Sequence, residues 1–183
     1  MKRTVFFLII VICTLQVHAQ RYFTRTGHVK FFSEAPLENI EAHNYQATCI
    51  VDIETGEVVS RILLKAFQFE KALMQEHFNE NYVESDKYPQ ASLNAVIKNL
   101  ESLDFESSNK QNVILEGKLT LKDATQDVSI NGDFHKKDNV FYVSSTFIIK
   151  PADYNIRIPR AVRNNIAGEI EVSLVFELEE FDR

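Results

Sequence analysis

Hydrophobic and polar residues alternate with a period of two along most of this chain. Segments 47–53 and 58–66 alternate in this way on either side of a turn at 54–57, where Gly56 can supply a positive φ. Such alternation gives each strand one dry face and one wet face. The pattern therefore predicts an antiparallel hairpin as a first unit of the fold.

The rest of the chain repeats this pattern with short connections. The further alternating segments are 22–26, 28–33, 93–97, 115–121, 128–134, 141–149 and 170–178. About eight or nine strands of this kind favour a sheet that closes on itself, because closure removes exposed edges. We predict an all-β fold, an eight-stranded antiparallel barrel. Gly117 and Gly132 fall on inward faces, where they mark either local bends or room inside the lumen.

One stretch departs from the period of two. Met74, Phe78 and Tyr82 are spaced i, i+4 and i+8, so they share one face of a helix predicted over about 70–83. Pro89 ends this excursion, because the residue before a proline is pushed into an extended conformation. The predicted helix is a crossover over one barrel end. Its apolar face would either seal a solid core or form part of a cavity wall.

The first 19 residues have the organisation of a secretory signal peptide. Lys2 and Arg3 precede an apolar run that begins at Val5, and the segment 17–19 has a small-x-small character. Cleavage before Gln20 would leave one domain over 20–183, and we expect a periplasmic or secreted protein. The apolar run is too short to span a membrane comfortably.

Charge and cysteine content narrow the function classes. Loss of Lys2 and Arg3 lowers the basic count from 20 to 18 against 26 acidic residues, so the formal charge falls from −6 to −8. Such an acidic chain is a poor candidate for binding nucleic acid or anionic membrane surfaces. Cys49 is the single cysteine of the predicted mature chain, so no internal disulfide is expected. Its apolar neighbours indicate a small core residue.

No motif of a catalytic or metal site stands out. The histidines of the predicted mature chain lack the close spacing of zinc ligands, and no phosphate-binding glycine loop or G-x-S-x-G elbow occurs. We therefore expect a protein without metal, cofactor or enzymatic activity. Arg157, Arg160 and Arg163 give a local basic spacing in an acidic chain. They fit either a solvated loop or a rim that attracts an anionic head group.

Three blocks in this order resemble the YceI-like family of lipocalin-like proteins. The first runs from Phe67 to Pro89 and ends in the Lys87-Tyr88-Pro89 turn. The second is Leu-x-Gly-x-Leu-Thr-Leu at 115–121, followed by Thr-x-x-Val at 125–128. The third is Asp-Tyr-x-Ile at 153–156 before the closing strand. Together the blocks cover nearly the whole chain after the predicted signal peptide.

The resemblance implies a lipocalin-like barrel whose tunnel holds a polyisoprenoid or other long amphiphilic lipid for transport or storage. The lining would come from inward strand residues and the helical face. The predicted lining residues are Ile62, Leu64, Phe67, Phe69, Met74, Phe78, Tyr82, Leu119 and Phe147.

A second interpretation stays open: inward phenylalanines could fill the lumen. The barrel would then be an interaction or stress-response module. The phenylalanines concerned are Phe134, Phe141, Phe147 and Phe176. A homodimer is also open, since no pattern fixes an interface.

Overall fold

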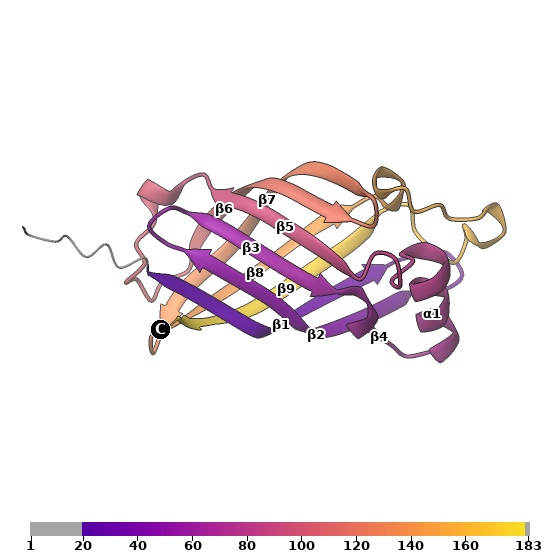
Figure 1. Ribbon diagram of the computed structural model, residues 1–183, viewed down its shortest axis with the longest axis horizontal. Helices are drawn as coiled ribbons and strands as arrows, with labels where there is room; N and C mark the ends of the chain where they lie inside the picture. Colours follow the sequence, from indigo (N-terminus) through magenta and orange to yellow (C-terminus); the bar gives the residue numbers. More distant parts are fainter. Residues whose placement is uncertain (1–19, 182–183) are drawn as a thin grey trace, which may run out of the picture.

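Eight long strands close into an antiparallel barrel in the computed structural model, which describes residues 20–181 (Figure 1). They are β1 (Arg21–Ser33), β2 (Ile40–Asp52), β3 (Glu57–Leu63), β5 (Gln90–Ile97), β6 (Gln111–Leu121), β7 (Ala124–Lys137), β8 (Val140–Ile149) and β9 (Ile170–Glu180). Their order around the barrel is β1-β9-β8-β7-β6-β5-β3-β2, and the β1–β2 hairpin closes the circle. The two-residue strand β4 (Gln68–Phe69) adds to β2. The predicted fold class is confirmed.

β1 merges two predicted strands, 22–26 and 28–33, into one. The register with β2 shifts between Thr24 and Val29, on both sides of Gly27. A bulge of this kind bends a strand and increases its twist, which a small barrel requires. The ring of Phe176 covers Gly27, since an added Cβ would lie 2.4 Å from its Cδ1. The break in alternation at Gly27 is therefore a bend inside a continuous strand.

β3 is shorter than its predicted range 58–66. The strand ends at Leu63, and a 3₁₀ turn, η1 (Leu64–Ala66), follows. The backbone N–H of Leu64 donates to the carbonyl oxygen of Pro89 at 2.9 Å, so this turn is tied to the start of β5. The chain leaves the barrel wall here and crosses the open end.

The crossover consists of α1 (Ala72–His77) and a π-helical turn, η2 (Phe78–Tyr82), which continues it. Figure 1 shows α1 beside one end of the barrel, next to β4. The predicted helical crossover at about 70–83 is thus confirmed. Within residues 20–181 no helix is long and apolar enough to cross a membrane. Besides η1, three short 3₁₀ turns lie in connections: η3 (Leu100–Ser102), η4 (Pro151–Tyr154) and η5 (Arg160–Val162).

The barrel end opposite α1 is filled by aromatic side chains. The ring centroid of Phe141 lies 4.3 Å from that of Tyr22 and 5.9 Å from that of Phe105. Phe134 packs against Phe105 at 5.4 Å. Phe105 belongs to the β5–β6 connection, which closes this end. Tyr22, Phe134 and Phe141 are each at most 5% exposed, so this half of the lumen is a packed core.

The two inward glycines, Gly117 and Gly132, mark close strand approach rather than free space. A Cβ added at Gly117 would lie 2.2 Å from the backbone oxygen of Asn94, and one at Gly132 would lie 2.8 Å from that of Ser144. Each position lies against a neighbouring strand, so the missing side chains do not indicate room in the lumen, and the predicted local bends stay a prediction.

We expect Gly117→Ala to lower the free energy of unfolding by about 1–3 kcal/mol, because the new methyl group must displace backbone atoms. Urea denaturation measures the change. Gly168→Ala is the matched control, since an added Cβ there meets nothing within 4 Å. Equal stability of the two variants would contradict the proposed close approach.

Candidate functional site

An apolar cavity of about 490 Å³ occupies the barrel half beneath α1 and η2. Its wall is built from β1, β2, β3, β5, β6, β8 and β9, from the crossover, and from the β8–β9 connection at 150–169. Inward positions such as Val29, Leu119 and Val172 form its inner wall, because alternation turns them toward the lumen. The volume lies in the range of small-molecule sites.

Four phenylalanines form one aromatic cluster on this wall. The ring centroid of Phe31 lies 5.2 Å from that of Phe67, 5.6 Å from Phe69 and 5.5 Å from Phe78. Phe78 also lies 5.2 Å from Phe69. Edge-on, tilted and stacked contacts at these distances stabilise aromatic pairs. The cluster anchors the crossover to the barrel through Phe78.

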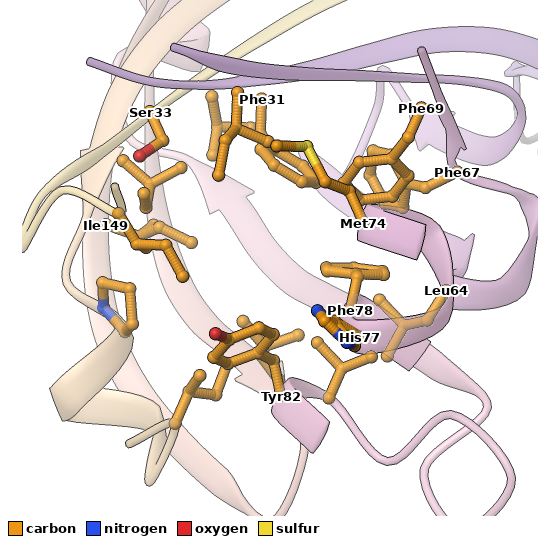
Figure 2. A pocket seen from close by; sticks show the side chains of 18 of the residues that line it. Phe31, Ser33, Leu64, Phe67, Phe69, Met74, His77, Phe78, Tyr82 and Ile149 are labelled. Atoms are coloured by element: carbon orange, nitrogen blue, oxygen red, sulfur yellow. The ribbon is translucent and has the colours of Figure 1, made fainter. Parts of the chain in front are cut away.

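The crossover has two faces of different character. Met74, Phe78 and Tyr82 point into the cavity, and the Met74 side chain reaches toward Phe31 (Figure 2). The opposite face carries polar groups, which line a separate shallow hollow. They include Gln75, Glu76, Asn79 and Glu80. Burial raises the pKa of the Tyr82 phenol, so its hydroxyl stays a neutral hydrogen-bonding group at the cavity.

The cavity is open beside α1, where its lining residues Lys71, Leu73 and His77 are exposed, and we call this end the mouth. The Lys71 ammonium, at the start of α1, forms an ion pair with Glu38, and His77 is exposed at the end of the same helix. Ser33 is 1% exposed, and its Oγ accepts a hydrogen bond from the N–H of Ala167 at 2.9 Å. A ligand in this cavity would therefore meet hydrocarbon inside and polar groups at the mouth.

The structure places all nine predicted lining residues on this wall. They are Ile62, Leu64, Phe67, Phe69, Met74, Phe78, Tyr82, Leu119 and Phe147. Their contact with a ligand stays a prediction. Sequence reasoning missed Phe31, which precedes the outward-facing Phe32, and also Val162 and Ile166 in the β8–β9 connection. The missed connection has an available signal, because Ile156 and Ile158 alternate, but the sequence interpretation of this segment, a solvated loop or an anion-attracting rim, did not include the cavity wall.

The four phenylalanines proposed to fill the lumen divide between its two halves. Phe134, Phe141 and Phe176 belong to the buried core and are absent from the cavity wall. Phe147 lies on the cavity wall. The barrel thus has a solid half and a hollow half, and each of the two sequence interpretations describes one of them.

Cys49 lies in the core, 3% exposed, and burial raises the pKa of its thiol to about 12. We expect no reaction with a disulfide reagent in the folded protein and full reaction in guanidinium chloride. As the pH rises from 9.0 toward 12, the unfolded chain loses this proton before the folded protein does. The free energy of unfolding should therefore fall over that interval. Denaturation of Cys49→Ala at the same pH values is the control, and an equal fall there would contradict the assignment to Cys49.

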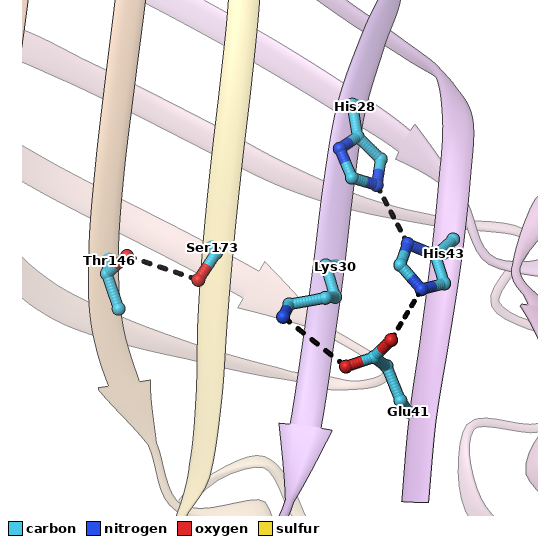
Figure 3. A network of polar contacts seen from close by, with 6 residues as sticks. All are labelled: His28, Lys30, Glu41, His43, Thr146 and Ser173. Carbon is cyan, nitrogen blue, oxygen red and sulfur yellow. Dashed lines mark hydrogen bonds and ion pairs between the residues drawn. The ribbon is translucent and has the colours of Figure 1, made fainter.

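A chain of polar contacts lies on the outer wall of the barrel (Figure 3). Nε2 of His28 lies 2.9 Å from Nδ1 of His43, whose Nε2 lies 2.8 Å from a carboxylate oxygen of Glu41. Lys30 also contacts Glu41, at 3.3 Å. Hydrogen bonds from His43 and Lys30 lower the pKa of Glu41, and burial lowers that of His28.

With the His43 ring in its Nε2–H tautomer, Nε2 donates to Glu41 and Nδ1 accepts from His28. The two histidines are far apart in sequence, and the β1–β2 pairing brings them together. Residues 20–181 contain no group of three or more His, Cys, Asp or Glu side chains that could hold a metal ion. The contacts tie the β1–β2 hairpin together from outside.

The family model of the YceI-like domain matches residues 16–178. This range contains the whole cavity wall and the aromatic core of the closed end. No curated protein matches the sequence.

Solved structures share the fold at low sequence identity. A polyisoprenoid binding domain from Saccharophagus degradans matches with a TM-score of 0.76 and 14% identity, over 88% of this chain and 98% of that one. BcnA from Burkholderia cenocepacia matches with a TM-score of 0.67 and 16% identity, over 83% and 95%. A YCEI protein from Campylobacter jejuni matches with a TM-score of 0.52 and 12% identity, over 75% and 81%. At these identities the likeness establishes the barrel fold.

Proposed function

This chain belongs to the family of YceI-like domains, and we propose that it holds a polyisoprenoid or another long amphiphilic lipid in its cavity. The observation that carries the proposal is the cavity of about 490 Å³ with a nearly unbroken apolar wall, open beside α1. A structural neighbour is described as a polyisoprenoid binding domain, which supports this ligand class. The chemistry of the wall fits a branched hydrocarbon chain.

Burial of such a chain supplies enough free energy for useful affinity. Each buried methylene contributes about 0.8 kcal/mol, so about ten of them contribute about 8 kcal/mol before the costs of association. A preformed cavity keeps those costs low, because the wall residues are already ordered by the barrel. The polar mouth would leave a ligand's head group in contact with water.

We propose transport or storage of the lipid without chemical turnover. The ionisable groups of the cavity wall include Glu38, Lys71 and His77 at the mouth, and Glu38 and Lys71 are paired with each other. General acid–base catalysis requires an ionisable side chain positioned within hydrogen-bond distance of the reacting atom. The inner wall presents hydrocarbon at Val29, Leu119 and Val172, where a bound chain would lie.

Native mass spectrometry of the purified protein, with mass spectrometry of its organic extract, tests the proposal. We expect a bound lipid mass in one-to-one stoichiometry, with a hydrocarbon chain identified in the extract. Repeated absence of any lipid, together with no uptake of an added polyprenol, would refute lipid binding. That outcome would favour the second candidate, an interaction module, which rests on the packed core around Phe141.

We also propose export, on the basis of the signal-peptide pattern at 1–19, which lies outside the described residues. The expected mature protein begins at Gln20, because the small residue Ala19 precedes that bond. N-terminal sequencing of the protein from a fractionated native host measures this directly. Recovery of the uncleaved chain from the cytoplasm would contradict the proposal.

A further inference from the structure

The mouth of the cavity is surrounded by an apolar and basic rim. We define the rim as segments 34–38, 70–74 and 157–166. Backbone and side-chain contacts join the three: the N–H of Leu37 donates to the carbonyl oxygen of Asn164 at 2.9 Å, and Lys71 pairs with Glu38. The rim is therefore one continuous surface around the opening.

The two most exposed large hydrophobic side chains within residues 20–181 both lie on this rim. Leu37 is 71% exposed and Leu73 is 60% exposed. Single exposed leucines are common on protein surfaces and need no explanation. Two exposed leucines at the entrance of an apolar cavity indicate an interaction surface at that entrance. Leu73 also reaches the cavity wall, so the apolar surface runs from the rim into the barrel.

The rim is also basic, although the chain is acidic. Arg157, Arg160 and Arg163 are all exposed, and none forms an ion pair with the part of the chain that the structure describes. The other charged groups of the rim are the Lys71–Glu38 pair and two acids, Glu34 and Glu70, which form no ion pair within residues 20–181. The rim is thus net positive.

The acidic residues of the crossover lie away from the mouth. Glu76 and Glu80 line the polar hollow on its opposite face, together with Lys65. Figure 1 shows the β8–β9 connection, which carries the three arginines, projecting beyond the barrel at the same end as α1. A flat surface approaching this end would meet the arginines and Leu37.

We propose that the rim docks the protein on a bilayer containing anionic lipids, with Leu37 and Leu73 inserted among the acyl chains and the three arginines on the head groups. Apolar residues flanked by basic ones are the standard composition of an interfacial anchor. Docking in this orientation places the mouth on the membrane, so an apolar chain can pass into the cavity without crossing water. The inference stands on the rim and extends the proposed function to a partner surface.

Vesicle flotation of the protein from Gln20 onward tests this, with phosphatidylglycerol–phosphatidylcholine vesicles against pure phosphatidylcholine. We expect tighter binding to the anionic vesicles and release by salt. Since each basic residue near the surface contributes about 1 kcal/mol, the Arg157→Gln, Arg160→Gln, Arg163→Gln triple variant should bind about 100-fold more weakly. Leu37→Ser should bind about tenfold more weakly. This factor corresponds to the lower end of the free energy that a leucine side chain gains when it is buried in an apolar environment.

Matched controls come from the outer wall of the barrel, outside the three rim segments. Arg25→Gln removes an exposed arginine of β1 that has no ion pair within residues 20–181, and Ile148→Ser removes a 53% exposed side chain of β8. Both should bind vesicles like the parent protein. Equal binding to both vesicle types, or an equal loss in Ile148→Ser and Leu37→Ser, would overturn the proposal. A dimer in sedimentation that Leu37→Ser dissociates would also overturn it, by assigning the rim to a second copy.

The two proposals fail separately. Leu37 does not line the cavity, so Leu37→Ser should retain the bound lipid mass in native mass spectrometry while losing vesicle binding. A protein that binds anionic vesicles through the rim but never carries lipid would refute the cavity function and leave the docking surface intact.

Discussion

Val172→Trp should abolish retention of lipid while leaving the barrel folded. Val172 is an inward residue of β9 on the cavity wall, and the indole would project into empty space. The chain has no other tryptophan, so the fluorescence of the variant reports on the cavity alone. We expect at least about a 100-fold loss of affinity for a polyprenol, which corresponds to about 2.7 kcal/mol.

Val175→Trp is the control, because it places the same substitution on the same strand with the side chain directed outward. Val175 is 49% exposed, so its indole should leave binding unchanged and emit as a solvated group. Titration of each variant with a polyprenol, followed by fluorescence and native mass spectrometry, gives the comparison. Undiminished lipid binding by a folded Val172→Trp protein would mean that the ligand lies elsewhere.

Phe141→Ala should have the largest effect on stability, a decrease of about 3–5 kcal/mol in the free energy of unfolding. Phe141 is 3% exposed and contacts the rings of Tyr22, Phe105 and Phe134 in the solid half of the barrel. Its removal leaves a void that the surrounding strands can fill only in part. Urea denaturation measures the loss.

Phe147→Ala on the same strand should behave in the opposite way. Phe147 already borders empty space, so its removal enlarges a cavity rather than creating one in a packed core. We expect a smaller loss of stability than in Phe141→Ala and a clear loss of lipid affinity. If the two variants destabilise equally and neither changes lipid binding, the division of the barrel into two halves is wrong.

That division shows what alternation can and cannot predict. A period of two determines the side of the sheet on which Phe141 and Phe147 lie, and both were predicted to face inward. It does not determine their depth along the barrel. Phe141 pairs with Leu178 and Phe147 with Val172, six residues along β8. At about 3.4 Å per residue the two rings are about 20 Å apart along the strand, one in the core and one on the cavity wall.

Other parts of the site depend on contacts that no local pattern encodes. The helical face of Met74, Phe78 and Tyr82 was predictable, because i, i+4 spacing is a local property. The rim required the pairing of Leu37 with Asn164, which are distant in sequence. The outer contact of His28 with His43 likewise depends on the β1–β2 register.

The aromatic core around Phe141 closes one end of the barrel, and this turns the cavity into a molecular ruler. Across a series of apolar chains, affinity should rise by about 0.8 kcal/mol for each added methylene until the chain reaches that floor. Longer chains then gain nothing, because their extra carbons remain outside the mouth. The blind end would also fix the direction of movement of a bound amphiphilic lipid: the lipid would enter with its tail first and leave with its head group first.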